Sequence, residues 1–357
     1  MINFRLVHFT NMLKYKTQSN IIKSILTLLF ISIIFNACQQ SSVSNKIPET
    51  KDIQTIKLLR LDKDLFETPP SEIGNKLKTI QSNYGEFYNV YFLQIMNFGS
   101  TQNEQFTTLI GNFIQNSDFK TLAKDCDSIY NSQKIEALEE NITEVFAKYQ
   151  ALYPNDTLPK VCTFISGFNN GIVTTDGYIG IGLDLFLGEN YKFYPSLEIP
   201  DYLTRRYTPE HLMPMFVKGM ASYKYPFDLA KPRLIDVLVN EGKMLYFLDQ
   251  MLPDTEDSLK IGYTNKQLEW SKSNEKNIYQ LLIDEGLFSA DYLKYRKYTE
   301  EAPFTVSLTD ESAPRIAWYC GWQVIKKFMD NNPDYTLDML MKETDSQKIL
   351  SLSKYKP

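Results

Sequence analysis

One stretch of β-type sequence interrupts a chain whose other patterned segments are helical. Between residues 160 and 184, runs of β-branched and aromatic residues alternate with the turn pairs Asn170-Gly171 and Asp176-Gly177. Both pairs tolerate the positive φ angles of tight hairpin turns. The pattern predicts a three-stranded antiparallel meander, with strands at residues 161–165, 172–175 and 178–183.

Amphipathic helices are predicted on both sides of this stretch, because apolar residues recur there at helical spacing. Residues 53–67, IQTIKLLRLDKDLFE, begin with near-alternation, which predicts a short edge strand that leads into a helix. With 43% hydrophobic residues, the chain can bury a large core. We predict an α+β, mainly α-helical fold, in which a helical region, residues 53–155, packs on a region with a small antiparallel sheet, residues 156–357.

The first 37 residues have the pattern of a signal peptide. Three lysines precede an apolar run at residues 24–35, which is too short to cross a bilayer core of ~30 Å. The run is followed by FNAC, which resembles a bacterial lipobox and implies cleavage before Cys38 and a diacylglycerol on its sulfur. The alternative is an ordinary signal peptide followed by an unrelated cysteine. Translation can begin at Met1 or at Met12.

Residues 38–52 are polar and without periodicity, which predicts a flexible tether. No acidic pair closely follows Cys38, so we expect acyl chains to anchor the chain facing the periplasm, on the inner or the outer membrane. The first 37 residues hold four basic and no acidic residues, so their removal changes the net charge from −5 to −9. Such an acidic chain is poorly suited to bind nucleic acid or an anionic lipid surface.

Three cysteines follow Cys38 in the chain: Cys126, Cys162 and Cys320. An odd number leaves at least one thiol unpaired, and no CxxC motif is present. We expect buried free thiols at these positions.

Glu241 lies on the apolar side of a predicted helix. The segment LVNEGKMLYFLDQML, residues 238–252, places Leu238, Met244 and Leu245 three or four residues from this carboxylate. A carboxylate on such a face is costly unless another group pairs with it. Glu241 therefore needs a partner, or a functional role that justifies its position.

The order of elements after residue 160 resembles a zincin-like metallopeptidase of the glutamate-ligand type. There, an HExxH helix supplies two metal histidines and a general base, and a Glu-Gly pair on the next helix supplies a third ligand, the place of Glu241-Gly242. Here the first helix reads HLMPM, with Leu212 in the place of the base and Met215 in that of the second histidine. His211 is the only histidine after the leader, and we interpret it as a surface or capping residue. We therefore predict no metal site, cofactor or catalytic residue.

Arg315 is a candidate partner for Glu241. In ESAPRIAWYCGWQVIKKFM, residues 311–329, Pro314 fits a first helical turn, and Arg315, Trp318 and Trp322 then share one face. An arginine beside tryptophans can stack on them and also pair with a carboxylate. This helix face either packs into the core as an aromatic surface or lines a groove that binds a peptide or a protein partner. Together with Trp270, the two tryptophans are also a candidate platform for a small ligand or glycan.

The chain from residue 53 to residue 345 resembles the GldB family of gliding-motility lipoproteins of Bacteroidota. The most specific segments are IGYTNKQLEW, residues 261–270, and the downstream GWQ, residues 321–323. The resemblance implies a periplasm-facing lipoprotein that supports gliding and the associated secretion of surface proteins, and it supplies no catalytic residue. The leading hypothesis is a non-catalytic lipoprotein that binds another envelope protein. The alternatives are an atypical metal- or carboxylate-dependent hydrolase near Glu241 and a peptide- or glycan-binding lipoprotein.

Overall fold

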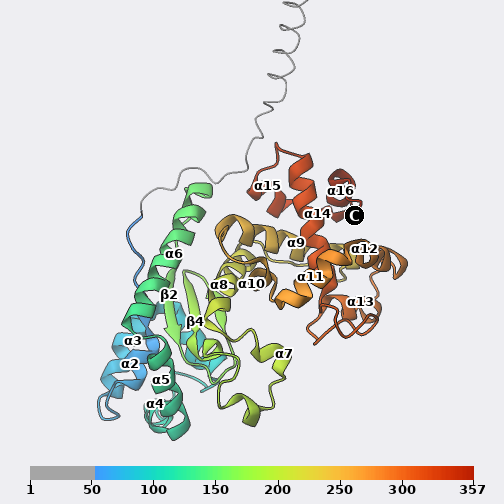
Figure 1. Ribbon diagram of the computed structural model, residues 1–357. Coiled ribbons are helices and arrows are strands. Elements are labelled where there is room, and N and C mark those ends of the chain that lie inside the picture. Colours follow the sequence, from blue (N-terminus) through green and yellow to red (C-terminus); the bar gives the residue numbers. More distant parts are fainter. Residues whose placement is uncertain (1–52) are drawn as a thin grey trace, which may run out of the picture. The chain divides into compact units, whose positions relative to one another are not determined.

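The computed structural model describes residues 53–357 (Figure 1). The predicted signal peptide, Cys38 and the tether lie outside the described residues. The described residues belong to one compact unit. The fold class is confirmed as α+β and mainly α-helical, with a single four-stranded sheet among these residues.

The sheet has the order β1-β2-β4-β3, formed by β1 (Leu59–Arg60), β2 (Lys160–Phe164), β4 (Tyr178–Gly182) and β3 (Ile172–Thr175). The predicted edge strand is confirmed, since β1 lies at one edge and leads directly into α2 (Leu61–Phe66). The antiparallel meander is wrong. Only β3 and β4 pair antiparallel, while β2 pairs with β4 and with β1 in parallel, so the sheet is mixed.

The loop after β2 explains this difference. Asp184 is fully buried, and its carboxylate accepts hydrogen bonds from the backbone N–H groups of Ser166 (3.1 Å) and Phe168 (2.7 Å). Gly167 and Phe168 adopt positive φ angles there. The chain thus wraps around a buried carboxylate after β2 and does not turn back as a hairpin, which leaves β4 to insert between β2 and β3.

Strand β4, with the sequence YIGIG, separates two hydrophobic cores. Ile179 and Ile181 contribute to the larger core, whereas Tyr178 belongs to the smaller one. A Cβ atom on Gly180 would lie less than 3.0 Å from the Phe87 ring. Alternate residues of a strand point to opposite faces. The glycine face of β4 therefore allows the N-terminal helices to approach the strand backbone.

Between α2 and β2 lie the helices α3 (Ile73–Asn89), the π-helix η1 (Val90–Ile95), α4 (Phe106–Gln115), α5 (Ser117–Ile129) and α6 (Ser132–Leu152). The segment that precedes β1 is attached to α6. The Ile56 N–H donates to the Thr143 hydroxyl at 3.0 Å, and the Leu58 N–H donates to the Glu139 carboxylate at 3.0 Å. Lys57 forms an ion pair with the same Glu139 carboxylate at 2.6 Å.

Short helices follow the sheet: η2 (Leu183–Phe186), η3 (Tyr194–Leu197) and α7 (Asp201–Thr204). The larger C-terminal helices are α8 (Pro209–Lys224), α9 (Leu234–Met251), α11 (Asn265–Ser273), α12 (Glu275–Asp284), α13 (Tyr292–Thr299) and α14 (Ile316–Asn331). The short helix α10 (Asp257–Ile261) lies between α9 and α11, and α15 (Leu337–Lys342) and α16 (Ser346–Ser353) follow α14.

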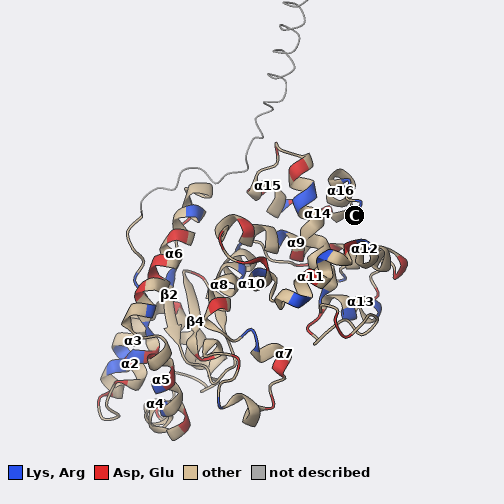
Figure 2. Cartoon of the chain, viewed as in Figure 1, with Lys and Arg blue, Asp and Glu red and all other residues tan. Residues whose placement is uncertain are grey.

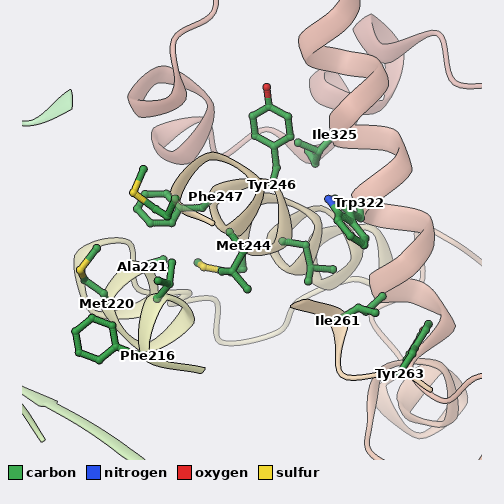
Figure 3. Close-up of a cluster of buried hydrophobic side chains, with 14 of the residues drawn as sticks. Phe216, Met220, Ala221, Met244, Tyr246, Phe247, Ile261, Tyr263, Trp322 and Ile325 are labelled. Carbon is green, nitrogen blue, oxygen red and sulfur yellow. The ribbon is translucent and has the colours of Figure 1, made fainter. Parts of the chain in front are cut away.

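Helix α9 lies between α8 and α14. Figure 3 shows Met244 and Phe247 of α9 among Phe216, Met220 and Ala221 of α8 and Trp322 and Ile325 of α14. Gly242 and Gly321 lie where α9 and α14 cross, because a Cβ atom on either one would come within 3.0 Å of the other helix's backbone. Gly242 thus serves this close approach of two helices, and that approach fixes the position of Glu241 beside it.

Acidic and basic residues are interspersed on the described helices. Helices α6 and α15 each carry both signs of charge (Figure 2). Within residues 53–357, no helix combines the length and the apolar character that a bilayer crossing needs.

Candidate functional site

Glu241 forms an ion pair with Lys218 of α8, with 2.7 Å between the carboxylate oxygen and the ammonium nitrogen. The Glu241 side chain is 17% exposed and that of Lys218 is 29% exposed. The prediction that Arg315 pairs with Glu241 is wrong in this structure. Helix α8 packs directly against α9 and brings Lys218 to the carboxylate, while the guanidinium of Arg315 has other partners.

The Lys218 ammonium also lies over the Trp318 ring, 3.7 Å from its centroid. Burial lowers the pKa of Lys218 below its ordinary value, and the Glu241 carboxylate opposes that shift. An ammonium between a carboxylate and an aromatic face is held by charge pairing and a cation–π contact. Lys218 therefore links α8, α9 and α14 at one partly exposed point.

Arg315 is the N-cap residue of α14 and has a positive φ of 50°. The helix begins at Ile316, so Pro314 precedes it and does not occupy its first turn as expected. The Arg315 side chain is 1% exposed, and its guanidinium lies 4.3 Å from the Trp318 ring centroid. Its Nη2 donates to the Ile261 carbonyl at 3.0 Å. Arg315 therefore ties the start of α14 to the end of α10.

Glu301 joins two arginines in the same cluster. One of its carboxylate oxygens is 2.8 Å from Nη1 of Arg206 and 3.2 Å from Nε of Arg315. Burial lowers the pKa of Arg315, and the nearby Glu301 carboxylate opposes that effect. The cluster thus holds the carboxylates of Glu241 and Glu301 against Lys218, Arg206 and Arg315.

Four buried N–H groups around this cluster lack a hydrogen-bond acceptor among the described residues. They are Nε of Arg205, Arg206 and Arg315 and Nε1 of Trp318. For Arg315, the oxygen of Glu301 is close enough for an ion pair but is not aligned for a hydrogen bond. Buried donors without acceptors are uncommon in folded proteins. We name the set Lys218, Glu241, Glu301, Arg206, Arg315 and Trp318 the arginine–tryptophan cluster.

The other two tryptophans lie elsewhere. Trp322 is fully buried, and its indole N–H donates to Asp249 at 2.7 Å. The Lys326 ammonium lies 3.8 Å from the Trp322 ring centroid. Trp270 of α11 is partly buried and packs against the larger core. The structure therefore brings Arg315 and Trp318 together and places Trp322 and Trp270 outside the cluster.

His211 is partly buried in the first turn of α8, with Nδ1 3.0 Å from the hydroxyl of the N-cap residue Thr208. Burial, together with the nearby Arg206, lowers the pKa of His211 to about 4. Leu212 lies in the core, and Met215 packs against it. The HLMPM turn thus contributes apolar packing at the positions where a metallopeptidase has its catalytic base and second histidine.

Within residues 53–357, no group of three or more His, Cys, Asp or Glu side chains has an arrangement that could hold a metal ion. The three cysteines of this part of the chain are buried free thiols, as expected. Burial raises the pKa of Cys320 above its ordinary value.

Sequence reasoning missed the cationic members of the site. Lys218 and Arg206 were not singled out, and neither was Lys243, which lies outside the cluster but only two residues from Glu241. An available signal was the NEGK order itself, since a lysine in a helix flanked by apolar residues must also find a partner. The partners of Lys218 and Arg206 depend on tertiary packing and have no local pattern.

A family model described as "Gliding motility protein GldB" matches residues 43–357 of the chain. The chain matches no curated protein and no solved structure. The match covers nearly the whole chain, including every residue of the arginine–tryptophan cluster and the sheet. The chain therefore belongs to the GldB family of gliding motility proteins.

Proposed function

We propose that this protein is a lipid-anchored envelope protein that faces the periplasm, binds another envelope protein and supports gliding without catalysing a reaction. Family membership supports a gliding-associated lipoprotein. The basic, apolar and FNAC segments before and at Cys38 support an acyl anchor.

The contact between Glu241 and Lys218 is the observation that supports a non-catalytic role. In the zincin-like interpretation, Glu241 is the ligand that would face a metal cation. Here its carboxylate instead faces an ammonium at 2.7 Å, which already supplies the opposite charge. A metal ligand must offer its lone pairs to the ion, so this pairing favours a structural role for Glu241 over a hydrolase site.

A complementation experiment separates the two roles. In a gliding strain that lacks the gene, a chain with Lys218→Met and Glu241→Leu together should restore gliding, because apolar replacements remove both members of a buried pair. A metal-dependent hydrolase predicts complete loss of gliding from the same double variant at normal protein level. Stoichiometric zinc in the purified wild-type chain, lost on Glu241→Ala, would also contradict the proposal.

The anchor is tested by metabolic labelling with an alkyne-tagged fatty acid. Label should be incorporated into the wild-type chain and lost from Cys38→Ser. Cys162→Ser is the matched control, because this thiol is buried in the fold and should not carry a lipid. Label that persists in Cys38→Ser would refute acylation at this residue.

The Arg206–Glu301 part of the arginine–tryptophan cluster, outside the Lys218–Glu241 pair, is the candidate surface for the protein partner. Arg and Trp are enriched where interfaces gain most of their binding energy. The side chains of Arg206 and Glu301 are partly exposed, at 22% and 31%. A photo-crosslinking residue in place of Arg206 should give one specific cross-linked product in envelopes of gliding cells, whereas the same residue in place of the exposed Glu269 should not. Equal products from both positions would count against this surface.

A further inference from the structure

A cavity of about 390 Å³ lies beside α9, away from the arginine–tryptophan cluster. Its wall is formed by the irregular segment after α8, by Asn240, Lys243 and Met244 of α9, and by the connection between α15 and α16. Its volume is in the range of pockets that hold small ligands or a few residues of a peptide.

Lys243 is the buried cation of this wall. It is 8% exposed, and its ammonium donates to the carbonyls of Glu343 (2.6 Å) and Met341 (3.2 Å). An ammonium has three N–H donors. The two carbonyls accept from two of these donors, and no carboxylate lies within ion-pair distance of Lys243 among the described residues. Burial lowers the pKa of Lys243 to about 8, and the nearby Glu343 carboxylate opposes that shift only in part.

Most other charges of the wall are already neutralised. Asp236 pairs with Arg233 at 2.8 Å, Glu343 pairs with Lys348 at 2.5 Å, and Lys342 pairs with Asp338 at 2.6 Å. Lys224 pairs with Asp156. Asp228 is exposed on the segment after α8. The cavity thus has one buried positive charge that an incoming anion could pair with.

The rest of the cavity is amphipathic. Phe227 and Leu229 are 40% and 49% exposed on the irregular segment, and Met244 and Met341 add apolar surface. Asn240 and Thr344 add side chains that can hydrogen-bond to a peptide backbone. A long acyl chain would leave these polar groups without partners, which disfavours a fatty acid as the ligand.

We propose that this cavity binds the free C-terminal carboxylate of a partner polypeptide whose last side chain is apolar. The carboxylate pairs with the Lys243 ammonium, the last side chain contacts Phe227, Leu229 and Met244, and the preceding backbone hydrogen-bonds to Asn240 and Thr344. This inference rests on the proposed function, since it names the chemistry of the partner.

The test uses fluorescence anisotropy with the full chain and dye-labelled hexapeptides that end in leucine. The free acid should bind about tenfold or more tightly than the C-terminal amide, because a charge-assisted pair is lost in the amide. A hexapeptide that ends in aspartate should bind more weakly than the leucine acid. Equal binding of acid and amide, or no binding of either, would overturn the proposal.

Two variants test whether Lys243 causes the preference for the free acid over the amide. Lys243→Met should abolish the preference for acid over amide, and Lys342→Met should keep it, because Lys342 lines the same cavity but is already paired with Asp338. If Lys243→Met does not fold, the acid-to-amide ratio of the wild-type chain decides alone. Displacement of the peptide by myristate with tighter binding than the peptide would assign the cavity to an acyl chain and overturn the proposal.

The outcome of the peptide-binding test can be distinguished from the outcomes of the experiments that test the proposed function. Lipid labelling at Cys38 and gliding by the Lys218→Met and Glu241→Leu double variant do not involve Lys243. Failure of peptide binding with both of those results intact refutes only the carboxylate site. Failure of labelling and complementation refutes the proposed function itself.

Discussion

Gly242 of α9 and Gly321 of α14 lie in direct backbone contact, so that a Cβ atom on either glycine would overlap the facing helix. This crossing joins the helix that carries Glu241 and Lys243 to the helix that carries Trp318 and Trp322. The position of both candidate sites therefore depends on two residues without side chains.

Gly242→Ala should destabilise the fold by about 3 kcal/mol, because the added methyl group must push two packed helices apart. Gly74→Ala on α3 is the control, since its Cβ atom would meet only the Thr107 methyl group at 3.4 Å. Alanine also favours helix by about 1 kcal/mol over glycine, so the control should be neutral or stabilising. Urea unfolding measures the difference in stability between the two variants. Equal unfolding midpoints for Gly242→Ala and Gly74→Ala would contradict a close helix contact at Gly242.

Glu241→Leu should destabilise the fold by about 3 kcal/mol, because Lys218 then remains charged in a largely buried place without its partner. Adding Lys218→Met should recover most of this loss. The exposed pair Lys272–Glu269 is the matched comparison, and Glu269→Leu should cost less than about 1 kcal/mol. A double-mutant cycle by chemical denaturation gives these values. A double variant as unstable as Glu241→Leu alone would show that the pair is not the cause.

Asp184 should make the fold less stable as the pH rises from about 4 to about 6. Burial raises the pKa of this carboxyl to about 6, and backbone N–H groups oppose that shift only in part. The folded state therefore keeps a proton that the unfolded state releases near pH 4, and the stabilisation is lost as the pH passes about 6. Over this range the unfolding free energy of the wild type should fall by up to about 3 kcal/mol relative to that of Asp184→Asn. A difference between the two unfolding free energies that does not change with pH would contradict the raised pKa of Asp184.

His211 should have the opposite effect over an overlapping range. Burial and Arg206 lower its pKa to about 4, so the folded state holds a neutral imidazole while the unfolded state binds a proton below about 6.5. Its contribution is fully present above about pH 6.5 and is lost as the pH falls through about 4. In His211→Gln the acid-induced loss of stability should shrink by at most about 3 kcal/mol. A pH profile unchanged from the wild type would refute this.

Elements with strong local patterns were predicted correctly from the sequence. The edge strand before α2, the strand with its YIGIG sequence and the helix that carries Glu241 all follow from periodicity and turn residues. The parallel pairing of β2 with β4 was not predictable in this way, because it depends on a loop folded around Asp184, eighteen residues beyond Ser166.

The candidate site was predicted only in part, for a related reason. The sequence predicts that Glu241 has a partner and that Arg315 can stack on tryptophan. In the structure Glu241 pairs with Lys218, and Arg315 stacks on Trp318. The choice between Lys218 and Arg315 is made by the packing of α8 on α9 and by the left-handed start of α14. Neither relationship has a spacing that a single sequence can reveal.

The attachment of residues 56–58 to α6 determines where a mechanical force on the N-terminal side would enter the fold. A pull on the chain at residue 53 would first stretch the contacts of Ile56, Lys57 and Leu58 with Thr143 and Glu139. Helix α6 would carry that tension, and the two-residue strand β1 would be shielded from it. The sheet would thus stay closed while the contacts of residues 56–58 with α6 hold.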